Sequence, residues 1–146
     1  YNCNNRRLPS FVTEKDITRS HKILGKLFQK YYKGNGEIYA SSSMREVLRV
    51  AKMSLEKKNP KFAVFSAHDS TVFSFLEFLG RESKILPPYA SHILFEIFTL
   101  NNEEQIRWTY NGEVIPLTKF DGNDYMPFSK FIMKVKKIYD ICHELP

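Results

Sequence analysis

The chain has 146 residues, 42% of them hydrophobic and 14% aromatic, which is enough apolar material for the core of one ordinary domain and excludes a disordered chain. No stretch approaches the roughly 20 apolar residues that cross a bilayer, and the polar first residues lack the layout of a signal peptide. The net charge of +6 raises the question of nucleic acid, but the lysines follow one helical face and no recognised motif accompanies them. We therefore expect no nucleic-acid partner, and the absence of an initial Met predicts that further sequence precedes residue 1.

Two amphipathic helices are expected first. Thr13 resembles an N-cap, and the apolar residues after it share one face, which predicts a helix over about residues 14–32 that ends near the Gly-Asn-Gly at 34–36. A second helix is predicted to begin after the serine run at 41–43 and to continue until Asn59 and Pro60 stop it. Both helices are expected to cover a sheet.

A short apolar run, FAVFSA at residues 62–67, follows the second helix. It is too brief for a helix and does not alternate, which is typical of a central strand buried on both faces. After His68 and Asp69 the apolar positions return to helical spacing, which predicts a strongly apolar helix that ends at Gly80. The chain is therefore expected to turn from strand to helix at His68 and Asp69.

The C-terminal half predicts a β-hairpin and a last helix. Residues 93–100 and 105–110 are rich in β-branched and aromatic side chains and flank a polar connection, while Asn111 and Gly112 mark a further turn. Residues 128–141 have helical apolar spacing. No repeat or interdomain linker is present, so residues 1–146 are assigned to a single domain, in which the aromatic side chains are expected to form core and Trp108 receives no role.

Cysteine and histidine are dispersed along the chain. Cys3 and Cys142 lie almost at opposite ends, which is neither a metal spacing nor a dense disulfide pattern; they can pair with each other, stay reduced, or pair outside this chain. No metal or cofactor is expected, because no metal site can be read from the four histidines, at His21, His68, His92 and His143.

His68 and Asp69 are the candidates for chemistry. They stand at the expected end of a strand and start of a helix, where backbone N–H groups and the helix dipole attract an anion. A histidine donates a hydrogen bond to a phosphate oxygen, and an adjacent aspartic acid protonates a departing alkoxide, so the pair suits cleavage of a phosphate ester. The alternative is structural, with the pair serving as a helix cap beside a partly buried imidazole.

Several ordered motifs bear on this choice. FSAHDSTV at residues 65–72 resembles the second signature of the histidine acid phosphatases, in particular of their prostatic and lysosomal branch. LPPYAS at 86–91, FEI at 95–97 and YNGE at 110–113 resemble the following segments of that family in order and spacing, and the stretch from Cys3 to Glu14 resembles the region before them. The resemblance therefore spans nearly the whole chain.

The resemblance implies a three-layer α/β/α sandwich of the phosphoglycerate mutase-like histidine phosphatase fold. It also implies a two-step, metal-free hydrolysis of phosphate monoesters in acid, in which a histidine of an Arg-His-Gly-x-Arg signature attacks phosphorus and water hydrolyses the phosphohistidine. His68 matches the family's phosphate-binding histidine, and Asp69 matches the acid that protonates the leaving group. We expect these two residues to be the catalytic contribution of the chain.

The sequence departs from the family in one large respect, because no Arg-His-Gly occurs in it. The nearest imitation, Arg19-Ser20-His21, falls within the first predicted helix, where His21 is expected on the surface. Residues 1–146 are therefore interpreted as the C-terminal part of a single catalytic domain, with the N-terminal half of the same protein supplying the nucleophile. The chain alone is expected to be inactive, and a naturally inactive relative is the alternative.

The cysteines depart as well. His92 stands where family members have a cysteine that bridges to the one resembling Cys3, so the resemblance implies an unpaired Cys3. It also implies a disulfide from Cys142 to the N-terminal half in an oxidising compartment. His92 and His143 are interpreted as structural or surface residues.

Two rival functions remain. One is a phytase or inositol-polyphosphate phosphatase of the same superfamily, since pocket residues outside the chain contribute to substrate choice. The other is a non-catalytic module that keeps only the phosphate pocket. The resemblance further implies a lysosomal, secreted or cell-surface location and a homodimer, and it leaves membrane attachment open.

Overall fold

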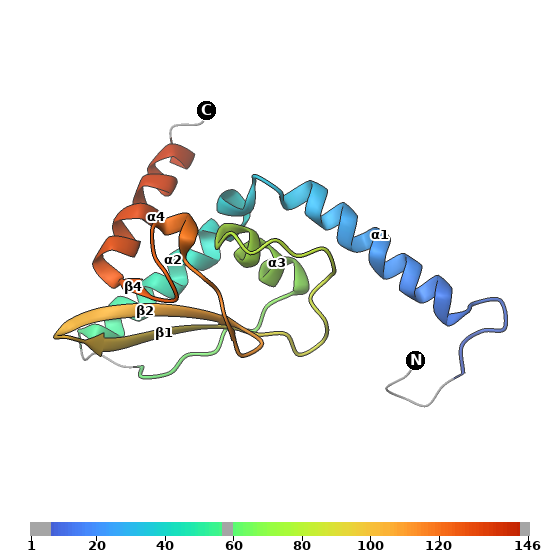
Figure 1. The fold of residues 1–146 in the computed structure, drawn as a ribbon, viewed down its shortest axis with the longest axis horizontal. Coiled ribbons are helices and arrows are strands. Elements are labelled where there is room, and N and C mark those ends of the chain that lie inside the picture. The colour runs from blue at the N-terminus through green and yellow to red at the C-terminus, as the bar shows by residue number, and fades with distance from the viewer. Residues whose placement is uncertain (1–6, 57–59, 144–146) are drawn as a thin grey trace.

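The computed structural model describes residues 7–56 and 60–143, the last five of them as backbone only. Helices cover one face of a small antiparallel sheet, and the first helix projects from this body (Figure 1). The expectation of a mixed α/β chain is confirmed at this level. The regular elements, in order, are α1 (Glu14–Tyr32), α2 (Gly36–Leu55), α3 (Asp69–Phe78), β1 (Ile93–Leu100), β2 (Glu103–Tyr110), β3 (Glu113–Val114), a 3-10 turn η2 (Thr118–Phe120), β4 (Met126–Pro127) and α4 (Phe128–His143).

Helix α1 has the predicted bounds, and the predicted cap explains its start. The amide of Asp16 donates to Oγ1 of Thr13 (3.3 Å), while the Asp16 carboxylate accepts from the amide of Thr13 (2.9 Å), so two otherwise unpaired donors are satisfied. The helix ends before Gly34, whose φ of 76° is readily adopted only by glycine. The basic side chains Lys22, Lys26 and Lys30 are exposed.

The predicted start of the second helix was wrong, because α2 begins at Gly36, ahead of the serine run. The serines lie inside the helix, where the hydroxyl of Ser41 donates to the carbonyl of Ile38 (2.7 Å). Tertiary packing decides this start: a Cβ on Gly36 would lie 2.7 Å from the amide nitrogen of Phe78, so only glycine permits α2 to approach α3 so closely. The helix ends at Leu55, ahead of the predicted stop at Asn59 and Pro60; Asn59 lies outside the described residues.

The predicted buried strand at residues 62–67 was also wrong for the described structure. The segment has no regular secondary structure, and every residue in it is exposed, Phe62 at 74% and Val64 at 77%. A strand needs a partner for its N–H and C=O groups and cover for its side chains. No strand of the described part of the chain pairs with the segment.

The sheet confirms the predicted hairpin, although its second strand begins at Glu103, two residues before the predicted start at residue 105. Strands β1 and β2 pair antiparallel over their full length, from Ile93 opposite Tyr110 to Leu100 opposite Glu103. The tight turn between them uses Asn101 and Asn102 at φ values of 53° and 61°, a backbone region that asparagine tolerates. A second turn leads into β3, while β4 pairs with the far end of β2.

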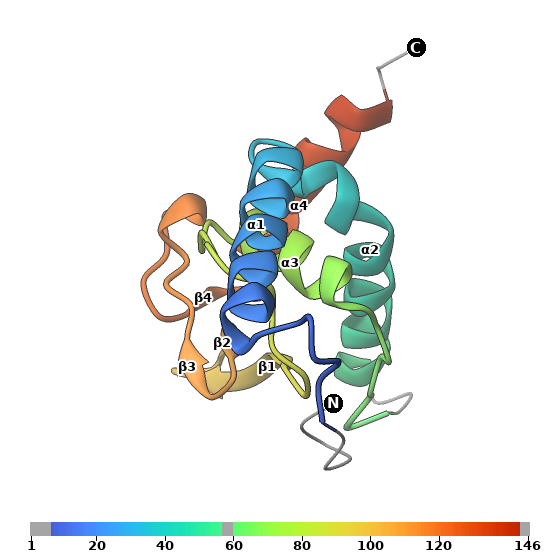
Figure 2. The ribbon, with the colours of Figure 1, turned by 90° about the vertical axis from the view of Figure 1, so that its right-hand side faces the viewer.

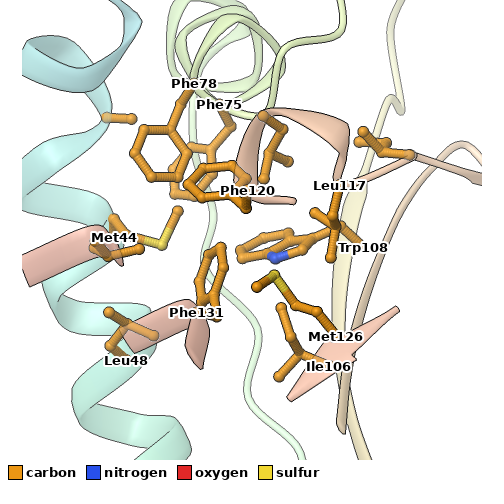
Figure 3. Packing of buried hydrophobic residues seen from close by; sticks show 14 of the residues in the cluster. Met44, Leu48, Phe75, Phe78, Ile106, Trp108, Leu117, Phe120, Met126 and Phe131 are labelled. Carbon is orange, nitrogen blue, oxygen red and sulfur yellow. The ribbon is translucent and has the colours of Figure 1, made fainter. Parts of the chain in front are cut away.

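One hydrophobic core lies between the inner face of the sheet and helices α2, α3 and α4 (Figures 1 and 2). Figure 3 shows its centre, where Trp108 of β2 faces Phe131 of α4 and Met44 of α2. Phe131 is completely buried, with its ring 5.1 Å from that of Phe120. The predicted helices at 69–79 and 128–141 are confirmed as α3 and α4, and the aromatic residues of β2, α3 and α4 form core as expected.

Candidate functional site

His68 and Asp69 are placed by the start of α3. His68 is the N-cap residue, in extended conformation, and its carbonyl accepts the first helical bonds, from the amides of Thr71 (3.0 Å) and Val72 (3.1 Å). Its imidazole forms no hydrogen bond that caps the helix. The ring is exposed and available to a ligand. Asp69 is the first helical residue.

The carboxylate of Asp69 is turned back to its own helix. Its Oδ1 accepts a hydrogen bond from the amide of Ser70 at 2.7 Å, and the side chain is exposed. The helix N-terminus therefore holds one oxygen and leaves Oδ2 for contact with solvent or substrate. Asp69 thus makes a local bond at the helix start, while His68 remains the N-cap residue.

A cleft of about 870 Å³ opens beside His68. Its walls are α2, the segment 60–68, the first turns of α3 and strand β1, and Trp108 lies at its floor. The lining is mainly apolar, with polar groups at a few positions. Asp69 is not among the lining residues, so the structure brings His68 to this cleft and leaves Asp69 beside its mouth.

Two stretches of backbone on the cleft walls have no strand partner among the described residues. Residues 62–67 form one wall, and the edge of β1 that faces away from β2 forms the other. They run in opposite directions, since residues 60–68 lead toward α3 while β1 points back from there (Figure 1). The end of the segment at His68 and the start of β1 at His92 are therefore at the same end of the cleft.

The cleft has few charges. Glu46 is the one carboxylate among its described lining residues, and Arg49 binds it through two bonds of 2.6 and 2.8 Å, which keeps the pKa of Glu46 below its usual value. The cationic or protonatable groups are Lys61, His68 and His92. The described lining thus favours an anionic over a cationic ligand.

The other candidates of the sequence are not brought to the cleft. His21 is exposed on α1, away from the residues that line the cleft. Cys3 lies outside the described residues, and so do the side chains of Cys142 and His143. In the described part of the chain, no group of three or more His, Cys, Asp or Glu side chains could hold a metal ion.

The interpretation of His92 as a structural or surface residue agrees with the structure, where it is exposed just before β1. The sequence did not predict that it lines the same cleft as His68. No spacing in the sequence joins two histidines that are separated by a helix and a long loop. The antiparallel course of segment 60–68 and β1 is the feature that brings them to one end of the cleft.

Comparison with known proteins gives three relatives, all phosphatases by name. The prostatic acid phosphatase of Bos taurus is 28% identical over 144 residues, covering 92% of this chain and 37% of the relative. The 2-phosphoxylose phosphatase 1 of Xenopus tropicalis is 28% identical over 125 residues, covering 71% of the chain and 24% of the relative. The prostatic acid phosphatase of Rattus norvegicus is 26% identical over 137 residues, covering 87% and 36%.

The chain thus spans between 24% and 37% of the length of these relatives. No protein-family profile matches it. Among the described residues, no helix is both long and apolar enough to cross a membrane.

Proposed function

We propose that the chain, which is similar to two prostatic acid phosphatases and a 2-phosphoxylose phosphatase, is the C-terminal part of an acid phosphatase that hydrolyses phosphate monoesters through a phosphohistidine. In this proposal His68 binds the phosphoryl oxygens and Asp69 protonates the leaving oxygen. The N-terminal half of the same protein supplies the nucleophilic histidine. The enzyme acts in the secretory pathway, in lysosomes or outside the cell.

The observation that carries the proposal is the cleft between residues 62–67 and the free edge of β1, which has room for one further strand. Two backbone edges that have no strand partner in the described part of the chain flank an apolar cleft. A six-residue strand, about 20 Å long, suits the length of the exposed segment. Burial of the exposed Phe62 and Val64 side chains would stabilise the protein by about 1.5–3 kcal/mol each. A strand from the N-terminal half therefore has both hydrogen bonds and apolar area to gain here.

Such a strand also places the nucleophile. If it runs parallel to residues 62–67, its C-terminal end lies beside His68, where α3 begins. A histidine that follows the strand is then next to the phosphate-binding imidazole and the N-terminus of α3. The sheet would extend to a mixed one with helices on both faces, which is the three-layer sandwich that the family resemblance implies.

The surroundings of His68 and Asp69 support these proposed roles. The exposed imidazole of His68 has no capping duty and is free to donate to an anion. Asp69 is fixed through Oδ1, so its Oδ2 can carry the proton that a poor leaving group needs. Hydrogen-bond donors that surround the phosphoryl group supply the electrostatic stabilisation that a metal ion supplies in other phosphatases.

Acid-free quenching of the full-length protein tests the proposal. The protein is mixed with a ³²P-labelled alkyl phosphate and quenched in alkali. Phosphohistidine is stable under these conditions, whereas phosphoserine and acyl phosphates lose their phosphate. We expect a labelled histidine in the N-terminal half and hydrolysis of the substrate in mild acid. The 146-residue chain alone, run in parallel, should incorporate no label and show no turnover.

Two outcomes would contradict the proposal. Steady hydrolysis by the purified 146-residue chain would show that the nucleophile lies within it. Hydrolysis by the full-length protein without any phosphohistidine would show a different mechanism.

A further inference from the structure

His92 is held at the entry of β1 by bonds that fix its backbone. Its amide donates to Oδ1 of Asn111 (2.9 Å), and its carbonyl accepts from the amide of Asn111 (3.0 Å). Nδ2 of Asn111 also lies 3.4 Å from the hydroxyl of Ser91, to which it donates. One asparagine side chain therefore fixes the two residues that lead into the strand.

The corner around His92 is braced from two further sides. Ala90 has a φ of 62°, a left-handed conformation that costs an alanine energy and is kept only where neighbours determine it. The hydroxyls of Ser91 and Tyr110 lie 3.3 Å apart. Arg81 lies over the ring of Tyr110, with its Cζ 5.1 Å from the ring centroid, and forms a 2.7 Å ion pair with Glu113. The corner is thus tied to the loop after α3 and to β3.

This support leaves the imidazole itself exposed. Its Nδ1 lies 3.4 Å from the carbonyl oxygen of Ala90, which is the acceptor when Nδ1 carries the proton. The other nitrogen, Nε2, is then open to a ligand, and the ring donates from both nitrogens when it is protonated. A strained, braced corner that presents a solvent-accessible imidazole is the arrangement expected of a binding residue.

The position of His92 suits a second contact to the substrate of the proposed reaction. His68 and His92 both line this cleft, His68 at the end of segment 60–68 and His92 just before β1, which runs in the opposite direction. The one carboxylate of the described lining, Glu46, is already paired with Arg49. A second anionic group of the substrate could therefore contact the imidazole of His92. No unpaired carboxylate of the described lining would repel it.

We propose that His92 is a specificity-determining residue that binds a second anionic group of the substrate. The substrates favoured are phosphate monoesters that also carry a carboxylate or another phosphate within reach of the cleft end. This inference rests on the proposed phosphatase function, and it specifies which phosphate monoesters the enzyme prefers.

The experiment uses two matched substrates and the full-length protein in mild acid. 3-Phosphoglycerate and glycerol 3-phosphate differ in one position, a carboxylate in the first and a hydroxymethyl group in the second. We expect His92→Ala to lower the ratio of their kcat/KM values by about three- to tenfold, the size of one partly exposed charged contact, with the loss mainly in the KM for 3-phosphoglycerate. His92→Lys, which keeps a cation at this position, should restore most of the ratio.

His21→Ala is the matched control, because it removes an exposed histidine that lies away from the cleft. It should leave the ratio as in the natural protein. An unchanged ratio in His92→Ala, or an equal loss for both substrates without rescue by lysine, would assign His92 a structural role and overturn the inference. If the natural protein hydrolyses neither ester and forms no phosphohistidine, the proposed function itself fails; activity with an unchanged ratio refutes the role of His92 alone.

Discussion

Replacement of Asp69 by Asn separates proton donation from every other role of this residue. In the structure Oδ1 of Asp69 accepts from the amide of Ser70 at 2.7 Å, and the side chain is otherwise exposed. Asparagine offers the same oxygen to the same amide, so the start of α3 should be preserved. Asp69→Ala removes that bond and is expected to cost about 0.5–1.5 kcal/mol of stability, which makes it the less informative variant.

The size of the effect depends on the leaving group. An alkoxide needs a proton as the P–O bond breaks, and positioned proton donation is worth about 10²–10⁴-fold, or about 3–5 kcal/mol of activation free energy. Nitrophenolate leaves largely without help. Asp69→Asn should therefore slow phosphoryl transfer from an alkyl phosphate by about this factor and transfer from nitrophenyl phosphate far less.

Single-turnover measurement of phosphohistidine formation in the full-length protein isolates the relevant step. His68→Ala removes a contact to the phosphoryl oxygens, which both substrates share, and should slow both by similar factors. Circular dichroism and thermal unfolding establish that each variant is folded. Equal slowing of both leaving groups by a folded Asp69→Asn protein would show that Asp69 orients phosphate or supports structure and does not act as the acid.

Two stability predictions can be checked by urea unfolding of the full-length protein. Phe131→Ala empties the centre of the core and should lower the free energy of unfolding by about 3–5 kcal/mol, whereas Met133→Ala, on the same helix with 59% of its surface exposed, should change it by less than about 0.5 kcal/mol. A loss below about 1 kcal/mol for Phe131→Ala would contradict the position of the core. Burial, and then the charge of Glu82, raise the pKa of Glu77, whose Oε1 is buried without a hydrogen bond in the described structure. The ionised form is thus penalised in the folded state, so the penalty is complete above the folded-state pKa and absent below the unfolded-state pKa. Glu77→Gln should raise the free energy of unfolding at neutral pH, and this gain should vanish in acid; a gain that is the same at every pH would refute the assignment.

The helices and the hairpin were predictable because local patterns determine them. The Thr13 cap, the helical spacing after Asp69 and the paired asparagines of the hairpin each act through neighbours in sequence. The start of α2 was not predictable in this way. It depends on the approach of Gly36 to the backbone of Phe78, a contact between segments far apart in the chain.

The candidate site was also predictable only where a local sequence motif determines it. His68 and Asp69 were identified from a contiguous motif, and the structure confirms that they stand at the start of α3. The buried strand before them was predicted from an apolar pattern that describes a strand with neighbours on both sides. The described residues contain no such neighbours, and residues 62–67 are exposed; the additional strand of the proposed function would account for both the pattern and the exposure. The position of His92 on the cleft depends on the course of the chain and not on a sequence motif.

The position of Trp108 makes its fluorescence a probe of the cleft. It is the single tryptophan of the sequence, 2% exposed, with its ring centroid 4.5 Å from that of Phe95 on β1 and 5.9 Å from that of Phe75 on α3. Its Nε1 has no hydrogen-bond partner among the described residues, and the indole lies at the floor of the cleft. Indole emission depends on the polarity and packing of its surroundings, so the fluorescence of the 146-residue chain reports on the packing at the floor of this cleft.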